Sequence, residues 1–165
     1  MNILTIINMN NNKLKILSLF DKKERKKVWL PDEIAKGEID ISKRKVTTWI
    51  HKSGHLAYVI YNSNGDFYAF MFDRFVHSYG FPSMCDWCHS IKPLNLMGAF
   101  RFQLDKKTSL TITICSDLNC IESIKNPNHY TMRETLTINE KIERYYRNIE
   151  NYIYRYILDK KMLQK

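Results

Sequence analysis

The chain holds four cysteines, and they fall into two close pairs, Cys85/Cys88 and Cys115/Cys120. Thiolates are soft ligands that suit a tetrahedral Zn2+, and structural zinc sites are commonly built from two such short pairs. The spacing therefore predicts one zinc ion held by all four cysteines. A closed four-sulfur set leaves no position open for water, so the ion is expected to be structural. His89 is expected to lie beside the site or on the surface, and not to bind the metal.

Three other interpretations of the cysteines compete with zinc. Cys85 to His89 also matches the C-x-x-C-H pattern of c-type haem attachment, which requires an exported chain. A redox dithiol would leave Cys115 and Cys120 without a role, and structural disulfides need an oxidising compartment. The apolar run from Ile3 to Ile7 is too short for the apolar region of a signal peptide. We therefore expect a cytoplasmic protein with reduced thiols.

The 26 residues between the cysteine pairs leave room for a β-hairpin. Two alternating or β-branched runs, residues 99–104 and 109–114, are predicted strands, and the polar residues 105–108 are their turn. Ser116 and Asp117 are favourable N-cap types ahead of a predicted helix from Leu118 to Lys125. A knuckle, a hairpin and a helix carrying the last ligand follow one another as in a treble-clef finger.

The predicted fold class is α+β, with antiparallel hairpins, flanking helices and this four-cysteine finger. Residues 1–12 are expected to form a weakly ordered lead-in, and residues 13–165 a single domain with the finger at about 81–128. A basic helix is predicted from Lys13 to Lys27, with Leu14, Leu17 and Phe20 on its buried side. Residues 56–61 and 67–72 predict a second hairpin, because the Asn64-Gly65 pair between them favours a tight turn.

A long C-terminal helix is predicted over residues 137–162. It opens on Thr137-Ile138-Asn139-Glu140, which is a capping box. At 100° per residue one apolar stripe is expected to pack on the core, with arginines and an asparagine opposite. The stripe comprises Ile138, Ile142, Tyr145, Ile149, Tyr152, Ile153, Tyr156 and Leu163, and the opposite face comprises Arg144, Arg147, Asn151 and Arg155.

The formal charge of +9 and the isoelectric point near 9.4 point to an acidic partner, either nucleic acid or an acidic protein surface. Part of this excess is local, because residues 13–27 hold seven basic and two acidic side chains. The sequence has no apolar run approaching the 18 residues of a membrane span, no Gly-rich phosphate loop and no G-x-S-x-G elbow. We therefore expect no membrane partner, no small-molecule substrate and no enzymatic activity.

Three segments together resemble the C-terminal domain of the elongation factor G-binding protein family, which includes the fusidic-acid resistance proteins. They are Met84 to His89, Cys115 to Cys120, and Arg133-Glu134-Thr135-Leu136-Thr137 ahead of the last helix. The resemblance extends more loosely over residues 14–157 and is to the shorter, single-domain members. It implies a mixed α/β domain with a four-cysteine zinc finger, again with Cys85, Cys88, Cys115 and Cys120 as ligands. It also implies binding to elongation factor G, which the resistance members help to free from a drug-stalled ribosome.

The resulting hypothesis is a monomeric zinc-finger protein that binds elongation factor G. The alternative is a finger that binds RNA or the ribosome, with Trp87, Phe100 and Phe102 as stacking platforms beside Arg101. For the factor, the predicted contact surface lies on the finger side, where exposed charge and aromatic area coincide. Its members are Lys106, Lys107, Lys125, Tyr130 and Arg133.

Overall fold

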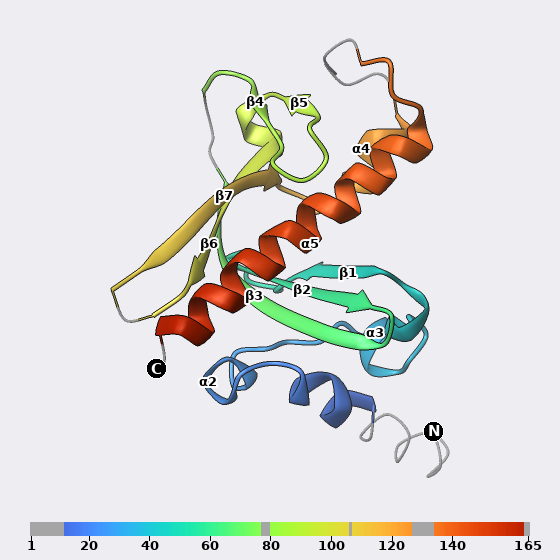
Figure 1. Cartoon of the computed structure of the whole chain (residues 1–165). Helices are drawn as coiled ribbons and strands as arrows, with labels where there is room; N and C mark the ends of the chain where they lie inside the picture. The colour runs from blue at the N-terminus through green and yellow to red at the C-terminus, as the bar shows by residue number, and fades with distance from the viewer. Residues whose placement is uncertain (1–11, 77–79, 106, 127–133, 164–165) are drawn as a thin grey trace. The chain divides into compact units, whose positions relative to one another are not determined.

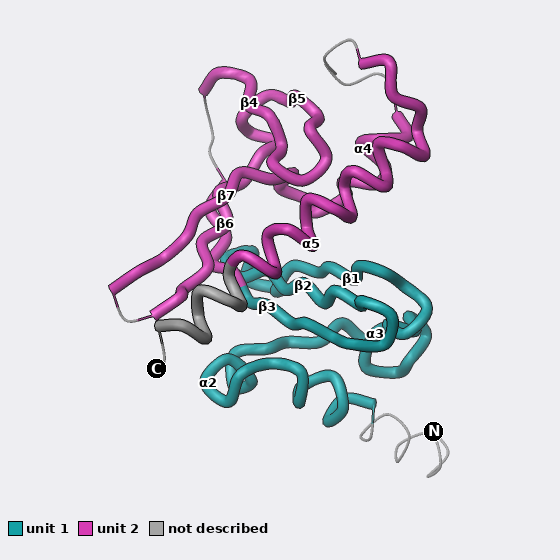
Figure 2. Tube along the Cα trace, in the orientation of Figure 1, with its two compact units in different colours: residues 1–71 teal, residues 72–165 magenta. Residues whose placement is uncertain are grey.

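The structure, a computed structural model, describes residues 12–76, 80–105, 107–126 and 134–163, the last eight through their backbone alone. The chain forms two compact units, Met1–Met71 and Phe72–Lys165 (Figure 2). The α+β class is confirmed: short helices precede the antiparallel strands, and a short helix and a long one follow them (Figure 1). The expectation of a single domain over residues 13–165 stays a prediction.

In the first unit, helical residues 12–18 are followed by α2 (Lys22–Arg25), α3 (Asp32–Ala35) and the 3-10 turn η1 (Ile41–Lys43). Strands β1 (Val46–Ile50) and β2 (Leu56–Ser63) pair antiparallel, with Val46 opposite Tyr61. β2 is hydrogen-bonded to β3 (Asp66–Val76), which begins in this unit and ends in the second. The predicted turn between them is confirmed: Asn64 and Gly65 both have positive φ.

The single basic helix predicted over Lys13–Lys27 is wrong, because the chain turns at residues 19–20 and restarts as α2. The physical reason is Phe20, which is drawn into the core and packs edge-on against Trp49 and Tyr58, with ring centroids 6.2 and 6.0 Å away. Arg25 then secures the turn by donating to the carbonyl of Phe20 at 2.8 Å. Leu14 was also misassigned: it is 66% exposed, and Ile16 is buried in its place.

The second unit contains the remainder of β3 and two hairpins. The short one pairs β4 (Ser83–Met84) with β5 (Ile91–Lys92). After the 3-10 turn η2 (Leu94–Leu96), the longer one pairs β6 (Met97–Gln103) with β7 (Ser109–Cys115), and β6 also pairs with the end of β3. This places a knuckle and a hairpin in the predicted order.

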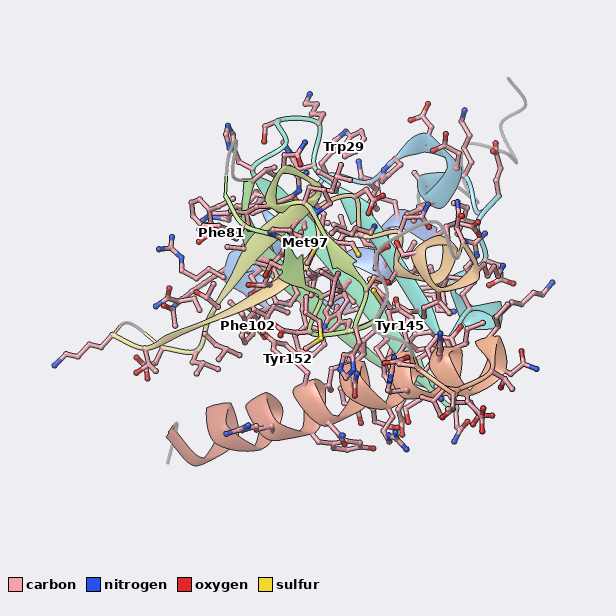
Figure 3. All side chains as sticks on the ribbon, turned by 90° about the horizontal axis from the view of Figure 1, so that it is seen from above. Trp29, Phe81, Met97, Phe102, Tyr145 and Tyr152 are labelled. Carbon is pink, nitrogen blue, oxygen red and sulfur yellow. The ribbon has the colours of Figure 1, made fainter. Side chains whose placement is uncertain are left out.

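Two helices complete the second unit, α4 (Cys120–Lys125) and α5 (Ile138–Leu163). The predicted capping box is present: the Glu140 carboxylate accepts from the Thr137 backbone N–H at 2.7 Å, and the Thr137 hydroxyl accepts from the Glu140 N–H at 3.3 Å. Tyr145 and Tyr152 point from α5 toward the sheet that carries Phe102 (Figure 3). Tyr145, Ile149 and Ile153 are buried, as the stripe predicts, whereas Ile138 is half exposed.

Candidate metal centre and its surroundings

The four cysteines meet at one point in the second unit. Cys85 directly follows β4 and Cys88 lies in the turn before β5, while Cys115 ends β7 and Cys120 begins α4. All four are buried, and their sulfur atoms lie within 4.8 Å of one another. The Cys85–Cys120 and Cys88–Cys115 sulfurs are 3.8 and 3.7 Å apart. A tetrahedral Zn2+ with Zn–S bonds of ~2.3 Å needs S–S separations of about 3.8 Å, so this cluster has the dimensions of a four-thiolate site.

The electrostatics of the cluster favour a bound cation. Burial raises the pKa of the Cys85 thiol well above its usual value. For Cys115 the effect is opposite, because hydrogen bonds from Cys120 and Cys85 lower the pKa of its thiol to about 7. Four buried thiols this close ionise together only against a positive charge, and a divalent metal supplies that charge. The arrangement is therefore suited to holding a metal.

The first knuckle is closed by its own backbone. The Cys88 N–H points at the Cys85 sulfur at 3.5 Å, the His89 N–H donates to the Cys85 carbonyl at 2.9 Å, and His89 has a φ of 60°. Asp86 joins the knuckle to β7, since its N–H donates to the Thr113 carbonyl at 2.8 Å and its carboxylate accepts from the Thr113 N–H at 2.7 Å. These bonds set the separation between the two cysteine pairs.

Lys92 is the residue at this site that the sequence did not reveal. It lies on β5 with only 4% of its surface exposed, and its ammonium donates to the Ser123 hydroxyl at 2.7 Å. That hydroxyl donates to the Asn119 carbonyl at 3.0 Å and lies 3.8 Å from the Cys115 sulfur. Burial lowers the pKa of Lys92, but the negative charges of Cys115 and Asp117 outweigh it and raise the pKa overall. A buried positive charge thus sits beside the sulfur cluster.

Helix α5 supports the back of the first knuckle. Asn148 donates to the Trp87 carbonyl at 3.0 Å and lies 3.1 Å from Nε2 of His89. The buried Trp87 ring packs edge-on against Tyr145, with centroids 6.5 Å apart. Burial lowers the pKa of His89, and the nearby Arg144 charge lowers it further. His89 therefore lies beside the cysteine cluster, held by α5, in agreement with the prediction.

Glu134 is the residue through which the Arg-Glu-Thr-Leu segment contacts helix α5. Its carboxylate accepts two hydrogen bonds from the Arg144 guanidinium, at 2.8 and 3.0 Å, and lies 3.8 Å from the Lys141 ammonium. These bonds lower the pKa of Glu134. Arg144, predicted on the solvent face of α5, is instead only 14% exposed, because this pairing draws it inward.

Of the residues predicted to contact a partner, Lys107 and Lys125 are exposed, Lys107 in the β6–β7 turn and Lys125 at the end of α4. Lys125 also lies 3.6 Å from the Glu122 carboxylate. Lys106, Tyr130 and Arg133 lie outside the described residues. The stacking platforms proposed for RNA are wrong: Trp87, Phe100 and Phe102 are all buried. Arg101 is exposed, but it pairs with Asp73 at 2.9 Å.

Comparison with known proteins gives a family match and a likeness to a solved structure. The family model described as FBP C-terminal treble-clef zinc-finger matches residues 17–156. One solved structure, the fusidic acid resistance protein FusC, is 18% identical with a TM-score of 0.45; the match covers 68% of this chain and 53% of FusC. The chain thus spans about half the length of that protein. No curated protein matches the chain.

The family match and the four clustered cysteines together support one structural zinc ion. Within the described residues, no helix combines the length and the apolar character needed to cross a bilayer.

Proposed function

Since the chain belongs to the FBP C-terminal treble-clef zinc-finger family, we propose that it is a zinc-dependent binding protein for translation elongation factor G. In this proposal Cys85, Cys88, Cys115 and Cys120 are the four ligands of one zinc ion, and the metal holds a docking surface and performs no chemistry. The protein acts in the cytoplasm as a monomer without enzymatic activity. Release of the factor from the ribosome, as in fusidic-acid resistance, is the finer form of the same proposal.

The family match over residues 17–156 carries this proposal. It is supported by the surface of the second unit, which exposes large apolar side chains: Phe75, Val76, Phe81, Met84 and Leu96. Phe81, labelled in Figure 3, is 92% exposed. Exposed apolar groups with charged neighbours are typical of protein-binding surfaces, where aromatic anchors supply affinity and charges steer the encounter.

The zinc ion cross-links the two cysteine pairs. The strands and helices attached to these cysteines then orient the proposed contact residues. Strand β7, which follows the turn that holds Lys107, ends at Cys115, and helix α4, which ends at Lys125, begins at Cys120. Asp86 bonds the first knuckle to β7, and Lys92 bonds β5 to α4. Loss of the metal is therefore expected to separate the residues that form the contact surface.

The test is a pull-down of purified elongation factor G at moderate salt, with nuclease-treated protein. Two double variants probe the surface, Lys106→Glu/Lys107→Glu and Lys125→Glu/Tyr130→Ala. Arg44→Glu/Lys52→Glu, at exposed positions of the first unit, is a charge-reversal control with the same change of net charge as the first of these. Each variant must retain zinc and a wild-type melt. We expect the control to bind like the parent and at least one finger variant to bind at least about tenfold more weakly. If both finger variants bind like the parent, the proposed surface is wrong; if the parent itself does not bind, the proposed partner is wrong.

A further inference from the structure

The positive charge of the first unit is concentrated in one segment. The proposed binding of elongation factor G through the finger gives this segment no role. The net charge of the unit comes entirely from residues 13–27, which hold seven basic and two acidic side chains. Residues 28–71 hold five of each and so are neutral as a set. A protein that needed positive charge only for solubility would not need to gather it in one segment of a unit that is otherwise balanced.

The fold turns this segment into a fixed surface. Ile16 and Phe20 are buried, so the helical residues 12–18 and the turn that follows them are held on the core, while α2 has no buried residue. Arg25 donates to the carbonyls of Phe20 and Ser18, which secures the corner between the two helical pieces. The residues that remain exposed are, with the exception of Leu14, Ser18 and Asp21, all basic: Lys13, Lys15, Lys22, Lys23, Arg25, Lys26 and Lys27.

The end of the segment is fixed to the aromatic core. The Tyr58 hydroxyl donates to the Lys27 carbonyl at 2.5 Å, and the Trp49 indole N–H donates to the Trp29 carbonyl at 2.7 Å. Both rings are buried. The lysines at positions 26 and 27 are therefore presented by an ordered backbone, which lowers the entropy lost when a rigid partner docks on them.

We infer that Lys13, Lys15, Lys22, Lys23, Lys26 and Lys27 form a docking surface for the phosphate backbone of double-helical RNA; we call these six residues the lysine face. Lysine is depleted at the centre of protein–protein interfaces, whereas lysine point charges are well suited to phosphates. The segment offers no exposed aromatic ring on which an unpaired base could stack, because Phe20 is buried. Duplex backbone is thus favoured over single strands.

The choice of RNA over DNA rests on the proposed function, which places the protein beside a translation factor. The lysine face itself rests only on charge and exposure in the first unit. It shares no residue with the surface proposed for a protein partner in the second unit. The two surfaces are therefore separable by mutation.

The experiment measures binding of a 20-base-pair RNA duplex to the purified full-length zinc-loaded protein by fluorescence anisotropy, from 50 to 300 mM salt. The wild-type dissociation constant should rise steeply with salt, with a log–log slope of about 4 to 5 if most of the six lysines contact phosphates. Lys22→Glu/Lys23→Glu and Lys26→Glu/Lys27→Glu should each weaken binding at least about tenfold and lower the slope by about two. Arg44→Glu/Lys52→Glu changes net charge by the same amount and should cost less than about threefold. All four positions mutated in the lysine face are exposed, so wild-type melts are expected.

Three results would overturn the inference. The first is no RNA binding by the wild-type protein at 100 mM salt. The second is an equal loss of RNA affinity in the Arg44→Glu/Lys52→Glu control, which would show that only the net charge of the protein matters. The third is tighter binding to vesicles with 30% anionic lipid, or to a DNA duplex of the same sequence, than to the RNA. Because no translation factor is present, failure here is distinct from failure of the factor pull-down, in which the lysine-face variants should bind like the parent.

Discussion

Replacement of Glu134 by Gln tests the bond between the Arg-Glu-Thr-Leu segment and helix α5. In the native protein both carboxylate oxygens accept from Arg144, and the two side chains are only 20% and 14% exposed. Glutamine keeps the shape but removes the charge and one acceptor. Arg144 Nε already has no hydrogen-bond partner among the described residues, so the arginine has little to compensate the loss.

The expected destabilisation is about 2 kcal/mol. Breaking a fully buried ion pair costs roughly 3–5 kcal/mol, and residual exposure together with the remaining amide bond reduces this figure. For a chain of this size about 1 kcal/mol corresponds to roughly 2–4 °C, so the melting temperature should fall by about 4–8 °C. The assay is thermal unfolding followed by circular dichroism, with zinc present throughout. Glu143→Gln, at an exposed position of the same helix, is the control and should shift the melt by less than about 1 °C.

The contribution of the Glu134–Arg144 pair to stability should depend on pH. Hydrogen bonds from Arg144 lower the pKa of Glu134 below its ordinary 4.5, so this pair stabilises the fold fully above pH 4.5 and stops doing so as the pH falls through the lowered value. The stability difference between wild type and Glu134→Gln should therefore be constant from pH 7 to about 5 and shrink below 4.5. A Glu134→Gln melt equal to wild type at pH 7, or a difference that grows in acid, would refute the pairing as a stabilising contact.

Other perturbations have equally direct readouts. Cys88→Ser should lower the zinc content below one per chain and lower the melting temperature, whereas a wild-type melt would contradict a structural metal. Lys92→Met should speed zinc loss to a chromogenic chelator several-fold, because it removes the buried positive charge beside the thiolates. An exposed-site control, Lys125→Met, should leave the rate of zinc loss unchanged. Equal rates in the two variants would contradict this role of Lys92. Thr137→Ala should destabilise the protein by about 1 kcal/mol through loss of the capping box, and urea titration showing no change would count against that cap.

Features encoded by neighbouring residues could be predicted from the sequence. The two cysteines of each pair lie close in the chain, so the pattern of two short pairs indicated a common metal, and the structure brings their sulfurs together. The Thr137–Glu140 cap is equally local and is present as predicted. Both hairpins were recognisable because apolar runs and turn residues follow one another directly.

Features set by distant contacts could not be predicted in the same way. The break in the basic helix depends on Phe20 reaching Trp49 and Tyr58, which are far away in the sequence. Lys92 gives no sign of burial in its own neighbourhood, because its partner Ser123 lies 31 residues further along. Phe100 and Phe102 are a different case: they alternate with Arg101 on β6, so the two-residue period of a strand already indicated that both share one face, opposite to the arginine.

The most direct test of the account is a calorimetric titration of elongation factor G with the nuclease-treated protein at 300 mM salt, before and after zinc removal. We expect a saturable 1:1 complex for the zinc-loaded protein, loss of that complex after chelation, and recovery when one equivalent of zinc is returned. Absence of binding by the zinc-loaded protein, or equal affinity of the zinc-free protein, would contradict it.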